Sequence, residues 1–170
     1  MDAHSRYLLC CQALTRTKEA AVKPFFEAAF RQYGMPEFIR SDNGGPFASL
    51  GLGGLSRLSV WWWKLGITPE RIHCSHPEEN SRQERMHLTL NEDVTHSPSP
   101  SISAQQEAFD KFRLEYNEDR PHEALDFQTP SNYMLFPAAN FLNRLKSLII
   151  LQIWKFGEFV AKVKLNGRDN

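Results

Sequence analysis

Residues 38–47, FIRSDNGGPF, join a short apolar segment to a sharp turn. Asn-Gly after such a segment is a strong turn signal, because both residues tolerate left-handed backbone conformations. Residues 37–41 are therefore predicted to form a strand that ends at Asp42. Asp42 then has two interpretations: a turn residue that bonds its own backbone, or a metal ligand held at the end of a strand.

Segments of strand and helix character alternate along the rest of the chain. The other strand candidates are the apolar residues 6–14 and the short extended segment 67–75. Helical spacing of apolar side chains predicts helices in residues 18–34, 55–66, 80–94 and 104–117. Pro24 lies inside the first helix and is expected to kink it or to mark a later start. The alternation predicts an α/β fold in which helices cover a sheet.

Aromatic and aliphatic side chains mark the expected core. An aromatic stripe at helical spacing is usually buried, and this applies to the three consecutive tryptophans 61–63. The core positions predicted for the two helices are Leu55, Leu58, Trp62 and Leu65 in the first and Phe109, Phe112 and Tyr116 in the second.

Composition indicates one soluble globular domain. The chain has 170 residues, of which 41% are apolar and 24% charged, and its formal net charge is zero. Residues 78–126 nevertheless carry 5 basic and 12 acidic side chains, so phosphate contacts have to come from local groups. The three cysteines fit a reducing compartment, and neither a signal peptide nor a membrane span is predicted. We expect an intracellular protein.

Glu84 is the second carboxylate with two interpretations. Ser81 and Glu84 fit the S-x-x-E pattern of a capping box, which would make Glu84 a helix cap. Alternatively, Asp42 at a strand end and Glu84 near the start of a helix supply the oxygen ligands that Mg²⁺ prefers. Bound metal ions can activate a water or a 3′-hydroxyl for attack on a phosphodiester.

The histidines give weaker signals. The cluster His73, Cys74 and His76 has no second ligand pair at zinc spacing, so we expect no zinc site there. His87 and His122 taken alone are expected to be polar surface or packing residues.

Three blocks occur in order along the chain: SDNGGPFAS, PEENSRQERMHLTL and EYNEDRPHEALDFQTPSNY. Together they resemble the catalytic core of retroviral-integrase-type (DDE) transposases from bacterial insertion sequences, over roughly residues 1–135. The resemblance implies a ribonuclease-H-like mixed sheet flanked by helices. It also implies that Asp42 and Glu84 are the second and third carboxylates of an Asp-Asp-Glu triad. The gap between them is longer than is common in the family, and the glycine-rich residues 44–56 are expected to absorb the difference.

The same resemblance implies the cofactor and the partners. The cofactor would be Mg²⁺ or Mn²⁺, and the partners would be DNA, as transposon ends and target, with a homo-oligomer expected from the family. On the helix of Glu84, Asn80, Arg85 and His87 are candidate contacts to phosphates or DNA ends. No membrane and no small-molecule substrate are expected, and the location would be the bacterial cytoplasm, at the nucleoid.

The chain departs from the family pattern at both ends. The segment MDAHSRYLL resembles the family's D-x-x-S-R element, so the first strand, with the first catalytic Asp, and most of the second strand are expected to be missing. Asp2 matches the strand-end position and is not expected to replace that ligand. The absent strand would lie at the middle of the sheet and would leave an open edge of backbone donors and acceptors. Residues 136–170 form an atypical tail.

Two hypotheses of function follow from this ancestry. The first is a strand-transfer domain that cleaves and joins DNA with Mg²⁺. The second is a catalytically inactive remnant that at most binds DNA or pairs with a full-length copy. A third interpretation, an unrelated α/β binding module with Asp42 as a turn residue only, has less support. Whether the chain is an enzyme is left open by the sequence.

Overall fold

The computed structural model describes residues 1–42, 44–47, 54–71, 77–94, 99–134 and 152–155, with the backbone alone for residues 77–83 and 152–155. The elements in chain order are β1 (Cys11–Leu14), α1 (Glu19–Tyr33), β2 (Phe38–Ser41), α2 (Arg57–Lys64), β3 (Thr68–Arg71), α3 (Pro77–Val94), α4 (Ile102–Glu118), the 3₁₀ helix η2 (Glu123–Leu125), α5 (Pro130–Tyr133) and β4 (Gln152–Lys155).

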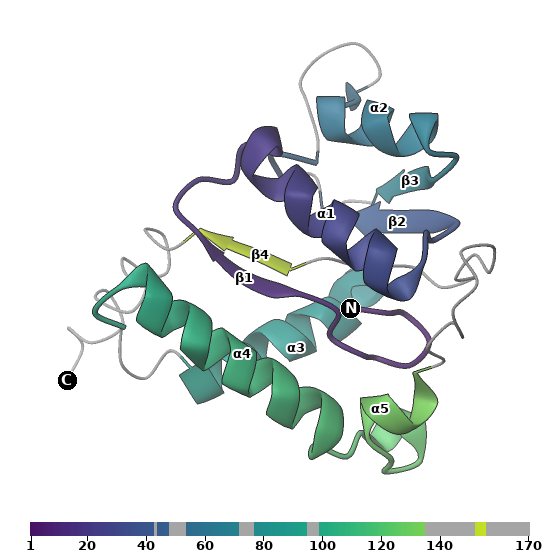
Figure 1. Ribbon diagram of the computed structural model, residues 1–170. Helices are drawn as coiled ribbons and strands as arrows, with labels where there is room; N and C mark the ends of the chain where they lie inside the picture. The colour runs from purple at the N-terminus through teal and green to yellow at the C-terminus, as the bar shows by residue number, and fades with distance from the viewer. Residues whose placement is uncertain (43, 48–53, 72–76, 95–98, 135–151, 156–170) are drawn as a thin grey trace.

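The described strands form two small parallel sheets between layers of helix. β2 pairs with β3 from Phe38 opposite Thr68 to Ser41 opposite Arg71, and β1 pairs with β4 from Cys11 opposite Gln152 to Leu14 opposite Lys155. Figure 1 shows α1 and α2 on one side of these strands and α3 and α4 on the other. The predicted α/β class, with strands layered by helices, is confirmed.

The segment around β1 belongs to two hydrophobic cores. Its side chains Tyr7 and Leu9 are buried in a cluster with the helices α1 and α2. Leu8, Cys11 and Ala13 are buried in a second cluster with α3 and α4. Side chains of an extended segment point to opposite faces, so a single strand can serve both layers.

Both edges of β1 are occupied. β4 lies along one edge. Toward α4, the Gln106 Oε1 atom accepts a hydrogen bond from the Ala13 N–H at 2.9 Å, and the Gln106 amide donates to the Cys11 carbonyl at 3.1 Å. Upstream, Asn117 binds the N–H and the carbonyl of Leu8 in the same way, at 2.7 and 3.2 Å. The predicted open edge is therefore wrong at β1, because a tail strand and two side-chain amides satisfy its backbone.

The helices agree with their apolar spacing except in three details. Of the three tryptophans 61–63 predicted to be buried, Trp62 is 0% exposed but Trp63 is 61% exposed, because three consecutive helical residues cannot share one face. α1 begins at Glu19 and continues through Pro24, so the predicted later start is wrong; Val22 and Phe26, both fully buried, hold the helix against the core on either side of the proline. Leu55 is exposed because α2 begins only at Arg57, after the N-cap Ser56. The Gly34 backbone, at φ 89°, ends α1 where the sequence predicts.

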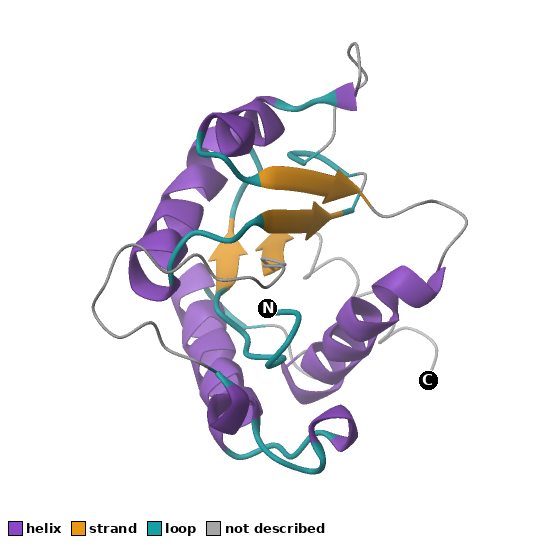
Figure 2. Ribbon diagram, turned by 90° about the vertical axis from the view of Figure 1, so that its right-hand side faces the viewer, coloured by secondary structure: helices purple, strands orange, loops and turns teal. Residues whose placement is uncertain are grey.

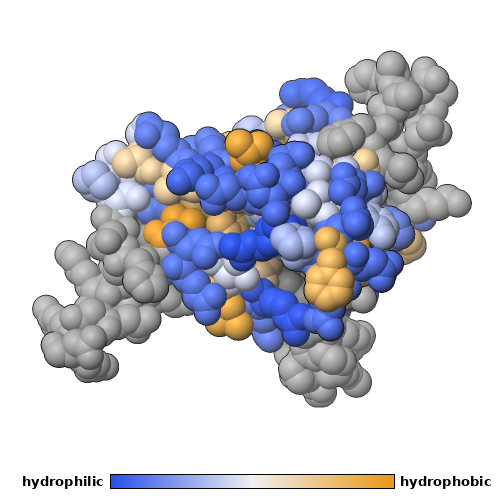
Figure 3. Space-filling model, turned by 90° about the horizontal axis from the view of Figure 1, so that it is seen from below, coloured by the Kyte–Doolittle hydropathy of each residue, from blue (hydrophilic) through white to orange (hydrophobic). Residues whose placement is uncertain are grey.

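None of the described helices is both long enough and apolar enough to cross a bilayer. The surface of the described residues is shown in Figure 3. Seen from below in Figure 3, it is mainly hydrophilic, with separate apolar residues rather than a broad apolar area.

Candidate metal and nucleic-acid site

Asp42 follows directly on β2, and its side chain is exposed. Its Oδ1 atom accepts a hydrogen bond from the Gly44 N–H at 3.0 Å, as in an Asx-turn. A Cβ at Gly44 would lie 3.2 Å from that same oxygen, which favours glycine there. The turn interpretation of Asp42 thus agrees with the structure. Its role as a metal ligand stays a prediction, and an exposed strand-end carboxylate is compatible with it.

Glu84 is an exposed residue in the interior of α3, since the helix begins at Pro77. The capping-box interpretation is wrong, because a capping Ser81 would need non-helical backbone and lies inside the helix. Proline at the first helical position starts the helix earlier than the S-x-x-E pattern suggests. Glu84 therefore lies beyond the first two turns of α3.

β2, which Asp42 follows, ends toward the side of the molecule on which α3 begins. Figure 2 shows β2 and β3 side by side and pointing toward the side on which α3 begins. The carboxyl ends of parallel strands are the usual place for ligand-binding groups in an α/β fold. Within the described ranges, no group of three His, Cys, Asp or Glu side chains lies close enough to hold a metal ion.

Asp2 has a structural role in the turn that precedes β1. Its Oδ2 atom accepts hydrogen bonds from the Ser5 N–H at 2.7 Å and the Ser5 hydroxyl at 2.6 Å, and its side chain is buried. The Asp2 N–H donates to the Tyr7 carbonyl at 2.8 Å, which closes the turn. The other carboxylate oxygen, Oδ1, is buried without a hydrogen-bond partner in the described chain, and the expectation that Asp2 is not a substitute metal ligand stays a prediction.

The structure describes the side chains of two of the three candidate DNA contacts on α3, and the role of all three stays a prediction. Asn80 lies on the helix, but its side chain is outside the described residues. Arg85 is exposed and lines a cavity, whereas the half-buried His87 does not line it. Residues two positions apart in an α-helix are rotated by about 200° about the helix axis. The side chains of Arg85 and His87 therefore face different directions.

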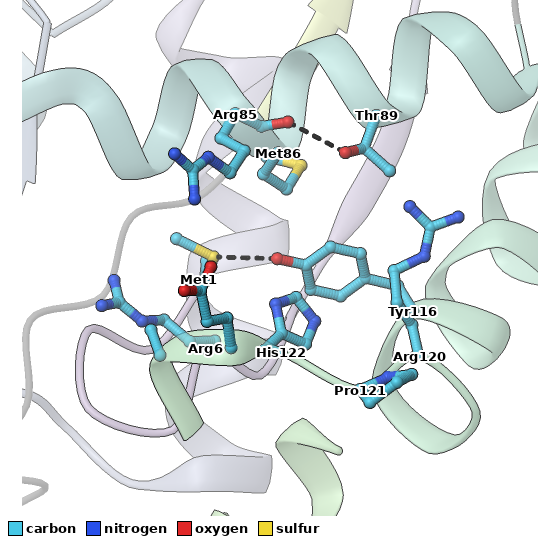
Figure 4. Close-up of a pocket in the computed structure, with 11 residues that line it drawn as sticks. Met1, Arg6, Arg85, Met86, Thr89, Tyr116, Arg120, Pro121 and His122 are labelled. Carbon is cyan, nitrogen blue, oxygen red and sulfur yellow. Dashed lines mark hydrogen bonds between the residues drawn. The ribbon is translucent and has the colours of Figure 1, made fainter. Parts of the chain in front are cut away.

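The cavity next to Arg85 has a volume of about 330 Å³. It lies between α3, the end of α4, the residues that follow α4, and the turn before β1, as the close-up in Figure 4 shows. Its lining consists of Met1, Arg6, Arg85, Met86, Thr89, Tyr116, Arg120, Pro121, His122, Glu123 and Ala124. Tyr116 and His122 lie at its centre, with Arg6 and Arg85 toward one side and Arg120 toward the other.

Contacts with buried groups fix the position of His122. Its ring meets the Tyr116 ring edge-on at 4.8 Å between centroids, and its imidazole hydrogen-bonds to the Tyr116 backbone. The buried Nε2 atom has no hydrogen-bond partner in the described chain, so that bond involves Nδ1. The Tyr116 hydroxyl lies 3.8 Å from the Met1 sulfur, and Arg120 forms an ion pair with Asp93 of α3.

Burial and positive charge govern the titration of this cavity. Burial lowers the pKa of His122; the hydrogen bond to Tyr116 opposes this, and the cations Arg120 and Arg6 lower it further. Burial raises the pKa of Tyr116 to about 12, against the opposing effect of the same two arginines. The imidazole is therefore neutral near pH 7 in a positive local field.

The cysteine and histidine predictions are tested only in part. His73, Cys74 and His76 lie outside the described residues, so the expectation of no zinc site there is untested. Cys10 and Cys11 are both free thiols. Burial raises the pKa of Cys10 to about 11 and raises that of Cys11 as well, so both stay protonated near neutral pH.

The sequence did not single out Arg6, Arg120 and His122 as a group with Arg85. Arg120 and His122 lie in the block EYNEDRPHEAL, where the spacing Arg-Pro-His was a visible signal without a residue-level role. Arg6 comes from a distant part of the chain, and only the fold brings it to the cavity.

Residues 65–130 match the family model described as integrase core domain. This range contains Glu84, Arg85 and His122, while Asp42 precedes it. Among curated proteins, the chain is 31% identical over 96 residues, or 56% of its length, to the Gag-Pol polyprotein of Baboon endogenous virus (strain M7). It is 31% identical over 96 residues to the Pol polyprotein of Feline endogenous virus ECE1.

A bacterial relative covers more of the chain. An uncharacterized 31.7 kDa protein of the insertion element IS407 from Burkholderia multivorans (strain ATCC 17616 / 249) is 28% identical over 108 residues, or 63% of this chain. The matched regions span 5%, 8% and 37% of the three relatives. The similarity is thus to an integrase-type core within longer proteins.

Proposed function

We propose that this chain, whose residues 65–130 match an integrase core domain, acts on DNA in integration or transposition, by Mg²⁺-dependent cleavage and strand transfer at phosphodiester bonds. The observation that carries the proposal is the integrase-core match over residues 65–130, which includes Glu84 on α3. A bacterial cytoplasmic location at the nucleoid and assembly into a homo-oligomer belong to the same proposal.

Asp42 and Glu84 are the proposed metal ligands. Both are exposed carboxylates on regular elements, one directly after β2 and one within α3, and carboxylate oxygens are the donors that Mg²⁺ prefers. A bound Mg²⁺ would polarise the phosphate and activate the attacking oxygen. The Gly44 N–H holds Oδ1 of Asp42, which orients that carboxylate on its turn.

The proposal predicts that Asp42→Asn and Glu84→Gln reduce Mg²⁺-dependent nicking of supercoiled plasmid to background. Both substitutions keep size and polarity and remove the charge that holds the metal. Matched controls are Glu92→Gln, an exposed glutamate on the same helix, and Asp126→Asn, whose left-handed backbone accepts asparagine. Both controls are expected to nick at the wild-type rate.

Two results would contradict the catalytic proposal. Equal nicking by the wild type, Asp42→Asn and Glu84→Gln would exclude these carboxylates as the site. DNA binding by the wild type without any Mg²⁺-dependent nicking would instead support the alternative, a chain that binds DNA and is catalytically inactive.

A further inference from the structure

The cavity beside α3 gathers positive charge in an acidic part of the chain. Residues 78–126 hold 5 basic and 12 acidic side chains, yet two of those five, Arg85 and Arg120, line this one cavity, where Arg6 joins them. Like charges brought together repel one another, so such a cluster is expected where it meets an anion. Of the carboxylates, only the exposed Glu123 lines the described cavity, and Asp93 pairs with Arg120 from beside it.

The positive field reaches into the cavity. Arg6 and Arg120 both act on the Tyr116 phenol, and both act on the His122 imidazole, although they come from segments far apart in sequence. The Asp93 ion pair ties Arg120 to α3, and the buried Tyr116 ring supports His122. Arg120 and His122 are therefore held by contacts with α3 and with a buried ring, whereas Arg85 is exposed on α3.

The lining also offers hydrogen bonds and an apolar wall. The buried Nε2 atom of His122 has no partner in the described chain, and in the neutral imidazole it is a hydrogen-bond acceptor, so the bonds to phosphate oxygens have to come from the arginines. Met86, Pro121 and Ala124 provide apolar surface beside it. The volume of about 330 Å³ is at the lower end of the range for small-molecule sites and suits one nucleotide unit.

We propose that this cavity binds a phosphate group of the DNA backbone, held by Arg6, Arg85 and Arg120, with the attached sugar against the apolar wall and His122 beside it. Arginine forks match phosphate oxygens in geometry, and contacts of this kind fix the position of a duplex without reading its sequence. The cavity would thus be a positioning site for DNA, separate from Asp42 and Glu84, neither of which lines it. This inference rests on the DNA-directed function proposed above.

The test measures binding of a short labelled DNA duplex to the full chain by fluorescence anisotropy over a range of salt concentrations. Arg85→Gln and Arg120→Gln are each expected to weaken binding roughly tenfold. Each should also lower the slope of log affinity against log salt by about one unit, because one phosphate contact is lost. Arg85→Lys, which keeps the charge, is expected to retain the slope.

The matched control is Arg31→Gln, which removes the same charge from the exposed i,i+4 pair with Glu27 on α1, away from the cavity. Its affinity and salt slope should equal those of the wild type. Arg85 is exposed on a helix and glutamine is a good helix former, so Arg85→Gln should fold normally, which circular dichroism checks. Unchanged affinity and slope in a folded Arg85→Gln and Arg120→Gln would overturn the proposal.

Competition with inorganic phosphate and binding by the carboxylate variants complete the test. Inorganic phosphate that displaces the duplex at low concentration would assign the cavity to free phosphate and overturn the DNA assignment. Glu92→Gln and Asp126→Asn, which change exposed carboxylates outside both proposed sites, should bind the duplex with the wild-type salt slope. If nicking fails while the arginine variants still weaken binding, the catalytic proposal fails and the cavity proposal stands.

Discussion

At the scale of single residues, His122 shows how a buried neighbour changes a titratable group. Its imidazole bonds the Tyr116 backbone and meets the Tyr116 ring, while Arg120 and Arg6 add positive charge nearby. Burial and the two arginines lower the pKa of His122, and the hydrogen bond to the Tyr116 backbone opposes them. The ring therefore lies in the cavity as a neutral group at physiological pH.

We expect His122→Gln to reduce the loss of stability at acid pH. In the folded chain the pKa of His122 lies below its ordinary value of 6.5, so the unfolded chain takes up the proton first as the pH falls. This contribution to stability is complete above pH 6.5 and is lost as the pH falls through 6.5 toward the folded-state pKa. Urea unfolding of both proteins above and below that pH measures the difference. The same pH dependence in both would contradict the expectation.

At the scale of elements, α4 does more than cover a face of the sheet. Its Asn117 side chain is buried and bonds both the N–H and the carbonyl of Leu8, while Gln106 bonds Ala13 and Cys11 eleven residues earlier on the same helix. Three turns of helix thus run along the extended segment and satisfy its backbone through side-chain amides. The amides fix the register of α4 on this segment.

Replacing Asn117 with alanine is expected to cost roughly 2–4 kcal/mol of unfolding free energy, because two buried backbone groups of Leu8 lose their partners. The matched control is Asn132→Ala, since Asn132 is exposed and its side-chain amide donates to the Gln128 side chain, which is exposed as well. It should change stability by less than about 0.5 kcal/mol. Denaturant unfolding measures the unfolding free energy of both variants. An equal decrease in both would show that the hydrogen bonds to Leu8 contribute no more to stability than the exposed bond of Asn132.

At the scale of the whole molecule, the two hydrophobic cores are joined through one extended segment. Tyr7 and Leu9 belong to the core of α1 and α2, and Leu8 belongs to the core of α3 and α4. Loss of either core would remove support from the same backbone. The two layers are therefore expected to unfold together.

A pair of adjacent tryptophans tests this coupling. Trp62 is 0% exposed and Trp63 is 61% exposed. Trp62→Ala should lower stability by about 3–5 kcal/mol, whereas Trp63→Ala should change it by less than about 0.5 kcal/mol. The loss in Trp62→Ala should appear as one cooperative transition, seen equally by aromatic and by backbone signals. Two separated transitions would show that the cores unfold independently.

Local patterns in the sequence predict part of this structure. The spacing of Phe109, Phe112 and Tyr116 predicts the buried face of α4, since helical periodicity needs only neighbouring residues. The Ser81–Glu84 pattern misplaces the start of α3, because the same letters fit a cap and a helix interior. The cavity is not predictable in this way: Arg6, Arg85 and Arg120 come from three separate segments that only tertiary packing unites.

The amides that cover β1 have a consequence for solubility. A strand bonded by Gln106 on one side and by β4 on the other offers no template for a strand of a second molecule. Self-association would then require α4 to detach first, so its rate should follow local opening of that helix more than protein concentration. In Gln106→Leu the Ala13 N–H and the Cys11 carbonyl would lose their hydrogen-bond partner and could bond a strand of a second molecule. Aggregation of this variant on mild heating should therefore begin earlier than that of the wild type.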